Sequence, residues 1–161
     1  MEKYACVRTD NMSGTIMAKD LLSLRYNEDI ENGNVLEIGG LEEGEREVRE
    51  GKTPTASSEL GKIALVASEE VVKDKSFAPV ASFKNIKGDI IRGYRLTPGD
   101  IFSVTIEALN CASDYEVTVG TVIELMEGTK LNAVASATEG STVVGEIIAI
   151  EDEGYVIEVN A

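Results

Sequence analysis

Apolar and polar residues alternate along much of the second half of the chain. Between Phe102 and Ala108 every second residue is apolar, and the residues between them are polar. This is the period of a half-buried strand, so the pattern predicts a strand over residues 102–108. Residues 97–100 read Thr-Pro-Gly-Asp, which is typical of a turn because Pro fixes φ and Gly permits positive φ. A shorter alternation predicts a strand over residues 115–119, with Gly120 marking a bulge or bend.

Two pairs of apolar segments flank short loops that contain Gly. The first pair is residues 123–126 and 130–135, and the second pair is residues 143–150 and 155–159. Loops of this length with Gly are common connectors of β-hairpins, so each pair predicts a hairpin.

Two more strands are predicted earlier in the chain, over residues 63–67 and 89–96. The stretch between them, residues 68–81, carries several charges and a Pro and predicts a long loop with one helical turn. Strands and turns at near-regular spacing are typical of a barrel or a sandwich. We therefore expect a mainly β fold, a small antiparallel β-barrel or sandwich with an N-terminal arm or hairpin region.

The N-terminal third of the chain is less regular. Residues 22–26 and 35–38 suit two strands around a strong Asn-Gly turn dipeptide at residues 32–33. Residues 20–24 equally suit the end of a short helix that begins near Ser13. The periodicity leaves both interpretations open.

A charged, Gly-rich segment and a linker-like segment follow. Residues 39–51 predict an exposed hairpin or loop, and residues 52–58, with Pro54 and four Ser or Thr, predict a linker. These features place a domain boundary there. They divide the chain into an N-terminal arm or hairpin region over residues 1–55 and a β-barrel or sandwich domain over residues 56–161.

Charge narrows the classes of partner. The chain has 161 residues with 15 Lys and Arg against 29 Asp and Glu, a net charge of −14. A phosphate backbone and an anionic membrane surface both attract basic proteins, so we expect neither nucleic acid nor membrane as a partner. The sequence shows no secretory signal and no apolar run long enough to span a bilayer. We expect synthesis in the cytoplasm, with Cys6 and Cys111 as reduced, unpaired thiols.

The chemistry available to the chain argues against catalysis. There is no His, the commonest general base and transition-metal ligand. The sequence has neither a phosphate-binding Gly-Lys-Ser/Thr loop nor a dinucleotide fingerprint. Residues 27–34 are acidic but lack the alternate ligand spacing of an EF-hand. The sequence does not exclude a carboxylate pair of the glycosidase type, but 29 acidic residues make chance proximity the rule and favour a solvated acidic surface. We predict no enzyme, and no catalytic, cofactor-binding or metal-binding residues.

Four segments carry a family resemblance. They are residues 26–35, 40–48, 118–123 and 143–151, which share turn glycines and a strand-like texture. Together they resemble small head-decoration or capsid-accessory proteins of tailed phages that infect Gram-positive bacteria. The resemblance offers no fixed motif from which binding residues are carried over.

The resemblance implies a virion structural protein that binds the outer capsid surface and stabilises the head. It implies the major capsid protein as partner, a possible homo-oligomer for which a trimer is plausible, and a place on the capsid exterior after synthesis in the host cytoplasm. The alternative is a non-enzymatic β-barrel binding module, either tail-associated in a phage or ligand-binding in a bacterium.

Overall fold

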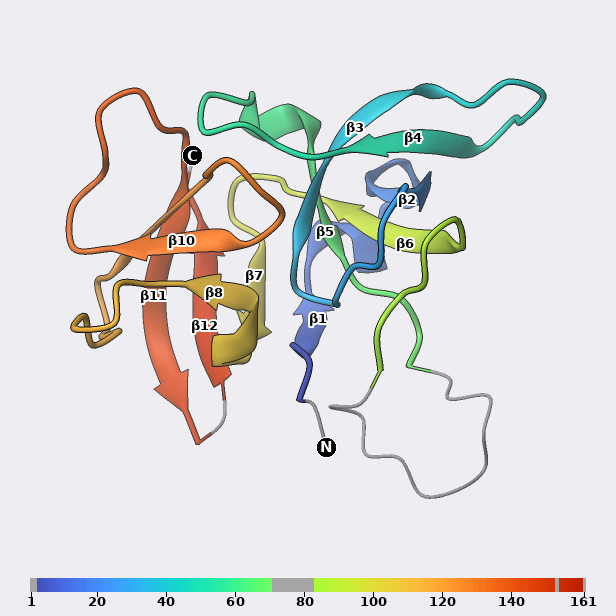
Figure 1. The fold of residues 1–161 in the computed structure, drawn as a ribbon. Helices are drawn as coiled ribbons and strands as arrows, with labels where there is room; N and C mark the ends of the chain where they lie inside the picture. Colours follow the sequence, from blue (N-terminus) through green and yellow to red (C-terminus); the bar gives the residue numbers. More distant parts are fainter. Residues whose placement is uncertain (1–2, 71–82, 153, 161) are drawn as a thin grey trace.

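The computed structural model describes residues 3–70, 83–152 and 154–160. It confirms the mainly β fold and arranges the strands as a closed barrel and a larger curled sheet. Figure 1 shows the barrel to the right and most of the sheet to the left, with the β3–β4 hairpin extending away from the sheet.

The barrel contains five of the described strands, each joined to its neighbour by backbone pairing. The order is β2-β4-β3-β5-β6, and β6 returns to pair with β2. The β2–β4 pair is parallel and the other pairs are antiparallel. The bounds are β2 Leu21–Arg25, β3 Val35–Leu41, β4 Val48–Lys52, β5 Ile63–Val66 and β6 Ile90–Arg95.

The sheet contains seven of the described strands in the order β1-β7-β12-β11-β9-β10-β8. Its pairs are antiparallel except β8–β10, which is parallel. The bounds are β1 Val7–Asn11, β7 Ile101–Val104, β8 Leu109–Asn110, β9 Val122–Glu124, β10 Leu131–Val134, β11 Val143–Glu151 and β12 Gly154–Val159. Short 3-10 turns lie at Ser13–Thr15 (η1), Ala18–Asp20 (η2), Leu60–Lys62 (η3) and Ile106–Ala108 (η5).

Strand β5 joins the two halves because both of its faces are buried. Ala64 and Val66 point into the barrel core, whereas Ile63 and Leu65 belong to the larger core shared with the sheet. All four side chains are fully buried. An uninterrupted apolar run of this kind is typical of a strand covered on both sides.

The barrel corrects the predicted domain boundary. Strands β2, β3 and β4 lie before residue 55, yet they form a closed barrel with β5 and β6, which lie after it. The division into residues 1–55 and 56–161 therefore cuts through the barrel. The described residues before position 55 supply buried core side chains such as Leu24 and Leu36, so they belong to the core. The sequence-based boundary falls inside the barrel because β2 pairs with β6, which lies far along the chain.

The predicted hairpins are present, and two predicted strands are not as expected. Strands β9–β10, β11–β12 and β3–β4 form antiparallel hairpins. The strand predicted over residues 102–108 ends at Val104, where the chain turns into η5. Residues 115–119 form no strand in the described chain. There the Thr121 hydroxyl bonds the Tyr115 hydroxyl at 3.0 Å and accepts from the Thr118 N–H at 3.0 Å, so side-chain contacts replace strand pairing.

The N-terminal alternatives are also resolved. Residues 21–25 form strand β2, and the preceding residues make the 3-10 turns η1 and η2. The Asn-Gly pair at residues 32–33 does not close a hairpin, because β2 pairs with β4 and β6 and not with β3. Most of the loop predicted over residues 68–81 lies outside the described residues.

Candidate functional site

A hollow of the described structure lies on the outer face of strands β2 and β6. Leu24 and Ile91 face the barrel core, and alternation along each strand turns Leu21, Ser23 and Ile90 outward. The hollow has a volume of about 790 Å³. We call it the barrel groove, and it is lined by Tyr4, Leu21, Leu22, Ser23, Ser68, Glu69, Phe83, Lys84, Asn85, Ile86, Asp89, Ile90, Ile91 and Arg92.

Exposed apolar side chains mark this groove. Ile90 is 56% exposed and Ile86 is 51% exposed, although both are large aliphatic residues. Leu21 at the other end of the strand pair is also exposed, and two further exposed residues, Ile16 and Met17, precede it in the chain. Exposed apolar side chains that line a hollow, as Leu21, Ile86 and Ile90 do, favour an interaction site.

Charged residues of both signs form the walls of the barrel groove. Arg92 pairs with Glu69 at 3.3 Å across one side. On the other side Lys84 pairs with Asp29 at 2.9 Å, and its ammonium lies 5.4 Å from the centroid of the Tyr4 ring. The hydrogen bond from Lys84, followed by that from the Lys87 N–H, lowers the pKa of Asp29. The groove thus has an apolar floor and a rim of paired charges.

A buried Asn holds the two walls together. Asn32 is 1% exposed, and its side chain both donates to the Ser68 carbonyl and accepts from the Ser68 N–H at 3.0 Å. Its carbonyl oxygen also accepts from the side-chain amide of Asn85 at 3.1 Å. Asn85 pairs by backbone with Ile30 as well. The segments on either side of the groove therefore meet at one amide group, and only the Asn-Gly turn signal hinted at this residue.

Burial also affects Glu70, the neighbour of the groove residue Glu69. Desolvation by burial raises the pKa of Glu70, and a hydrogen bond with the Asn32 side chain partly opposes that effect. Desolvation therefore disfavours the charged form of this carboxylate.

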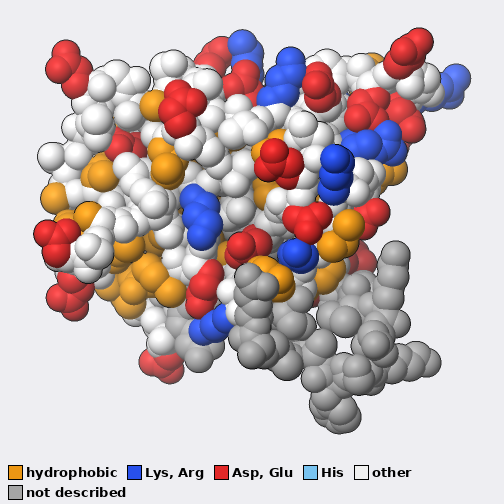
Figure 2. All heavy atoms as spheres, viewed as in Figure 1, with side chains coloured by type: hydrophobic (Ala, Val, Ile, Leu, Met, Phe, Trp, Pro, Cys, Tyr) orange, Lys and Arg blue, Asp and Glu red, His pale blue; other side chains and the backbone are white. Residues whose placement is uncertain are grey.

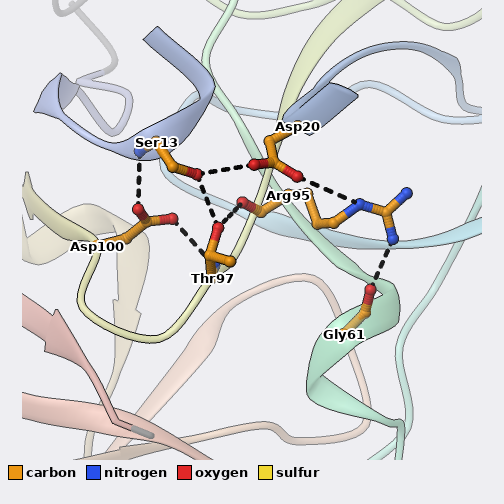
Figure 3. Close-up of polar contacts among 6 residues, drawn as sticks. All are labelled: Ser13, Asp20, Gly61, Arg95, Thr97 and Asp100. Carbon is orange, nitrogen blue, oxygen red and sulfur yellow. Dashed lines mark hydrogen bonds and ion pairs between the residues drawn. The ribbon is translucent and has the colours of Figure 1, made fainter. Parts of the chain in front are cut away.

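A second polar cluster joins the barrel to the sheet (Figure 3). Asp100, which is 4% exposed, accepts hydrogen bonds from the N–H groups of Ser13 at 2.7 Å and Thr97 at 2.9 Å. The Ser13 hydroxyl lies 2.8 Å from the Thr97 hydroxyl and donates to Asp20 at 3.0 Å. Arg95 lies 3.9 Å from the other oxygen of Asp20. These bonds tie the β1–β2 connection to the β6–β7 connection, and every member has a partner, so the role is structural.

A third feature is a buried carboxylate in the sheet. Glu124 is 1% exposed and accepts three hydrogen bonds, from the side chain of Asn132 at 3.0 Å and from the N–H and hydroxyl of Thr138 at 2.9 and 2.8 Å. These bonds hold the loop after β10 against the sheet. The hydrogen-bond donors are neutral groups, and the role of Glu124 is to fix this loop.

The acidic stretch over residues 27–34 is engaged in structural contacts. Asp29 holds Lys84, and Glu31 accepts the Ala5 N–H at 2.7 Å. Asn32 and Asn34 are buried. Within the described residues no three Cys, Asp or Glu side chains come together as a metal site would need.

Cys111 is a half-buried free thiol. No helix in the described part of the chain is long and apolar enough to cross a membrane.

Comparison of the chain with protein-family models, with curated proteins and with solved structures finds no match.

Proposed function

We propose that this protein is a virion structural protein that binds the outer surface of a phage head through the barrel groove and stabilises the shell. It acts by contact and not by catalysis. Its partner is the major capsid protein, and it occupies the capsid exterior. The proposal joins the family resemblance of the sequence to the geometry of the groove.

The observation that carries the proposal is the apolar floor between charged walls. Protein interfaces combine a desolvated apolar centre with a polar rim. Ile86 and Ile90 supply the centre, and the Arg92–Glu69 and Lys84–Asp29 ion pairs supply the rim. Ile90 is 56% exposed, so a partner that buries the rest of its side chain gains about 1–2 kcal/mol.

Charge supports the outer surface over the inner one. A net charge of −14 is repelled by packaged DNA, whereas it favours solubility and a neutral or basic partner on the outside of the shell. Many copies on a repeating lattice stabilise the assembled state by mass action, because they bind the intact shell and not its free subunits.

Co-sedimentation tests the proposal. Shells assembled from a candidate major capsid protein, without this protein, are mixed with the purified chain and sedimented. We expect the chain to sediment with the shells and to raise their resistance to heat. Ile90→Asp should weaken binding by about tenfold or more, since it places a charge in the apolar floor.

Leu41→Asp is the matched control. Leu41 is 53% exposed against 56% for Ile90, but it lies on β3 and outside the barrel groove. The control should bind as the unmodified chain does. Absence of co-sedimentation at micromolar concentration, with unchanged shell stability, refutes the decoration role. Equal loss in both variants shows that the groove is not the contact.

A further inference from the structure

The sheet has an open edge at β10. The end strand β8 is only two residues long, and it pairs with the first two residues of β10 at Leu131 and Asn132. No described strand continues beside Ala133 and Val134 on that side. In a strand, backbone N–H and C=O groups point alternately to either edge, so part of this stretch presents hydrogen-bonding groups to the open side.

A groove lies beside this edge. After Asn110 the chain leaves the sheet and turns back at Ala112, whose carbonyl accepts the Tyr115 N–H at 3.0 Å. The space between this turn and β10 is about 640 Å³. We call it the edge groove, and it is lined by Asn110, Cys111, Ala112, Asp114, Tyr115, Asn132, Ala133, Val134 and Ala135. Figure 2 shows hydrophobic side chains gathered on this side of the molecule, where Figure 1 places β8.

The shape of the edge groove suits a polypeptide backbone. Ala112, Ala133 and Ala135 have small side chains, which permit a main chain to approach to the spacing of roughly 4.7–4.9 Å between paired strands. The Tyr115 ring forms a wall, and its hydroxyl is fixed by Thr121 at 3.0 Å. A small molecule would leave the strand edge unpaired, whereas an added strand satisfies it.

The charge of the edge groove favours a basic sequence in an added strand. Asp114 is exposed and is the one charged side chain among the described residues that line the groove. The surrounding protein carries a net charge of −14. An approaching segment with Lys or Arg therefore meets a favourable field, and an acidic segment is repelled.

We propose that the edge groove binds an extended, basic peptide segment of a partner protein, which adds a strand to the sheet at β10 and sets a Lys or Arg against Asp114. Recognition uses main-chain hydrogen bonds for affinity and alternate side chains for selection. The edge groove shares no lining residue with the barrel groove, so this inference stands independently of the decoration role.

Nuclear magnetic resonance of the full chain tests the inference. The probes are peptides of about six residues, the usual length of a strand, that alternate Thr and Val and carry one Lys at each position in turn. At least one peptide should shift the amide signals of residues 132–135 and 111–115 at millimolar concentration. The same peptide with N-methyl groups on alternate amides should bind about tenfold more weakly, because its main-chain donors are blocked.

Charge reversal provides the second arm. Asp114→Lys should lower the affinity for the Lys-bearing peptide by about fivefold to tenfold. Glu43→Lys makes the same change in net charge at an exposed position of the β3–β4 hairpin and should leave the affinity unchanged.

Three results overturn the inference. They are unshifted amide signals at residues 132–135, equal binding of the N-methylated peptide, and equal effects of the two charge reversals. Sedimentation of the chain alone supplies a further check. A dimer whose contact maps to residues 132–135 would show that a second copy, and not a basic partner segment, fills the edge.

Discussion

Replacing Gly145 with Ala tests a close backbone approach between β11 and β12. Gly145 lies in β11 opposite Val159 of β12. A Cβ built on Gly145 falls 1.9 Å from the carbonyl oxygen and 2.8 Å from the carbonyl carbon of Glu158. Both are backbone atoms, so rotation of a side chain cannot relieve the overlap.

The size of the effect follows from the shift that the backbone must make. Separations below 3.0 Å essentially never occur for a real Cβ, so the oxygen must retreat by about 1.1 Å. That movement strains the pairing of β11 with β12, next to the hydrogen bond that the Asn160 N–H donates to the Val144 carbonyl at 2.9 Å. It also disturbs the buried Val159. Overpacking costs about 1–3 kcal/mol, and each weakened hydrogen bond adds about 0.5–1.5 kcal/mol. The expected loss is roughly 3–5 kcal/mol, which corresponds to a fall in Tm of roughly 6–20 °C for a chain of this size.

Thermal and urea unfolding measure the change, with Gly40→Ala as control. Gly40 also lies in a strand, but a Cβ there meets no described atom within 4 Å. Removing chain entropy from the unfolded state should make that variant equally stable or more stable by about 0.4–1 kcal/mol. A Tm for Gly145→Ala within about 2 °C of the unmodified chain would refute the assigned approach of β11 and β12.

Three further predictions concern buried or partly buried acids. Asp100→Ala should lower the unfolding free energy by about 2–5 kcal/mol in urea titration, because it leaves the N–H groups of Ser13 and Thr97 unpaired, whereas Asp100→Asn should lose less. Glu124→Ala should lower the unfolding free energy by about 3 kcal/mol, because the Thr138 N–H and hydroxyl lose their acceptor, and it should speed amide exchange in the loop after β10. Burial raises the folded-state pKa of Glu70, so the folded chain binds its proton more tightly than the unfolded chain. Its charge therefore lowers stability as pH rises above the ordinary pKa of 4.5, and Glu70→Gln should remove that loss in pH-dependent melting.

Local patterns predicted the hairpins because their contacts are local. The β9–β10 and β11–β12 pairs join neighbours in sequence, and alternation with Gly in the loop is sufficient to identify them. The apolar run of β5 likewise follows from its burial on both faces. In each case the residues that set the pattern also make the contact.

Long-range pairing could not be predicted in this way. The barrel closes because β2 pairs with β6 more than 60 residues later, and β2 also lies parallel to β4. The linker-like composition of residues 52–58 suggested a boundary, but such a composition also suits a surface connection inside one domain. The alternation of residues 115–119 was overridden by the Thr121 hydroxyl, whose bonds to Tyr115 and Thr118 are side-chain contacts that periodicity does not register.

The same long-range contacts explain why no candidate site was visible in the sequence. The barrel groove brings together Tyr4, Leu21 and Ile90, and its walls meet at Asn32. Tyr4, Leu21 and Ile90 belong to no motif identified in the sequence, and Asn32 belongs only to the Asn-Gly turn signal. The charge pattern indicated only that a partner should be neutral or basic.

Fixed walls have a consequence for binding at the barrel groove. The segments that contain Ser68 and Asn85 are held by a buried amide whose hydrogen bonds are protected from water. A partner therefore meets walls that are already ordered, and it loses less free energy to immobilising them than it would at a mobile loop. Asn32 is 1% exposed and Ile90 is 56% exposed, so a change at Asn32 should loosen the walls while the exposed Ile90 side chain stays available to a partner. Weaker binding in such a variant would arise from lost pre-organisation, and weaker binding in Ile90→Asp from lost contact, so the two contributions are separable in the same groove.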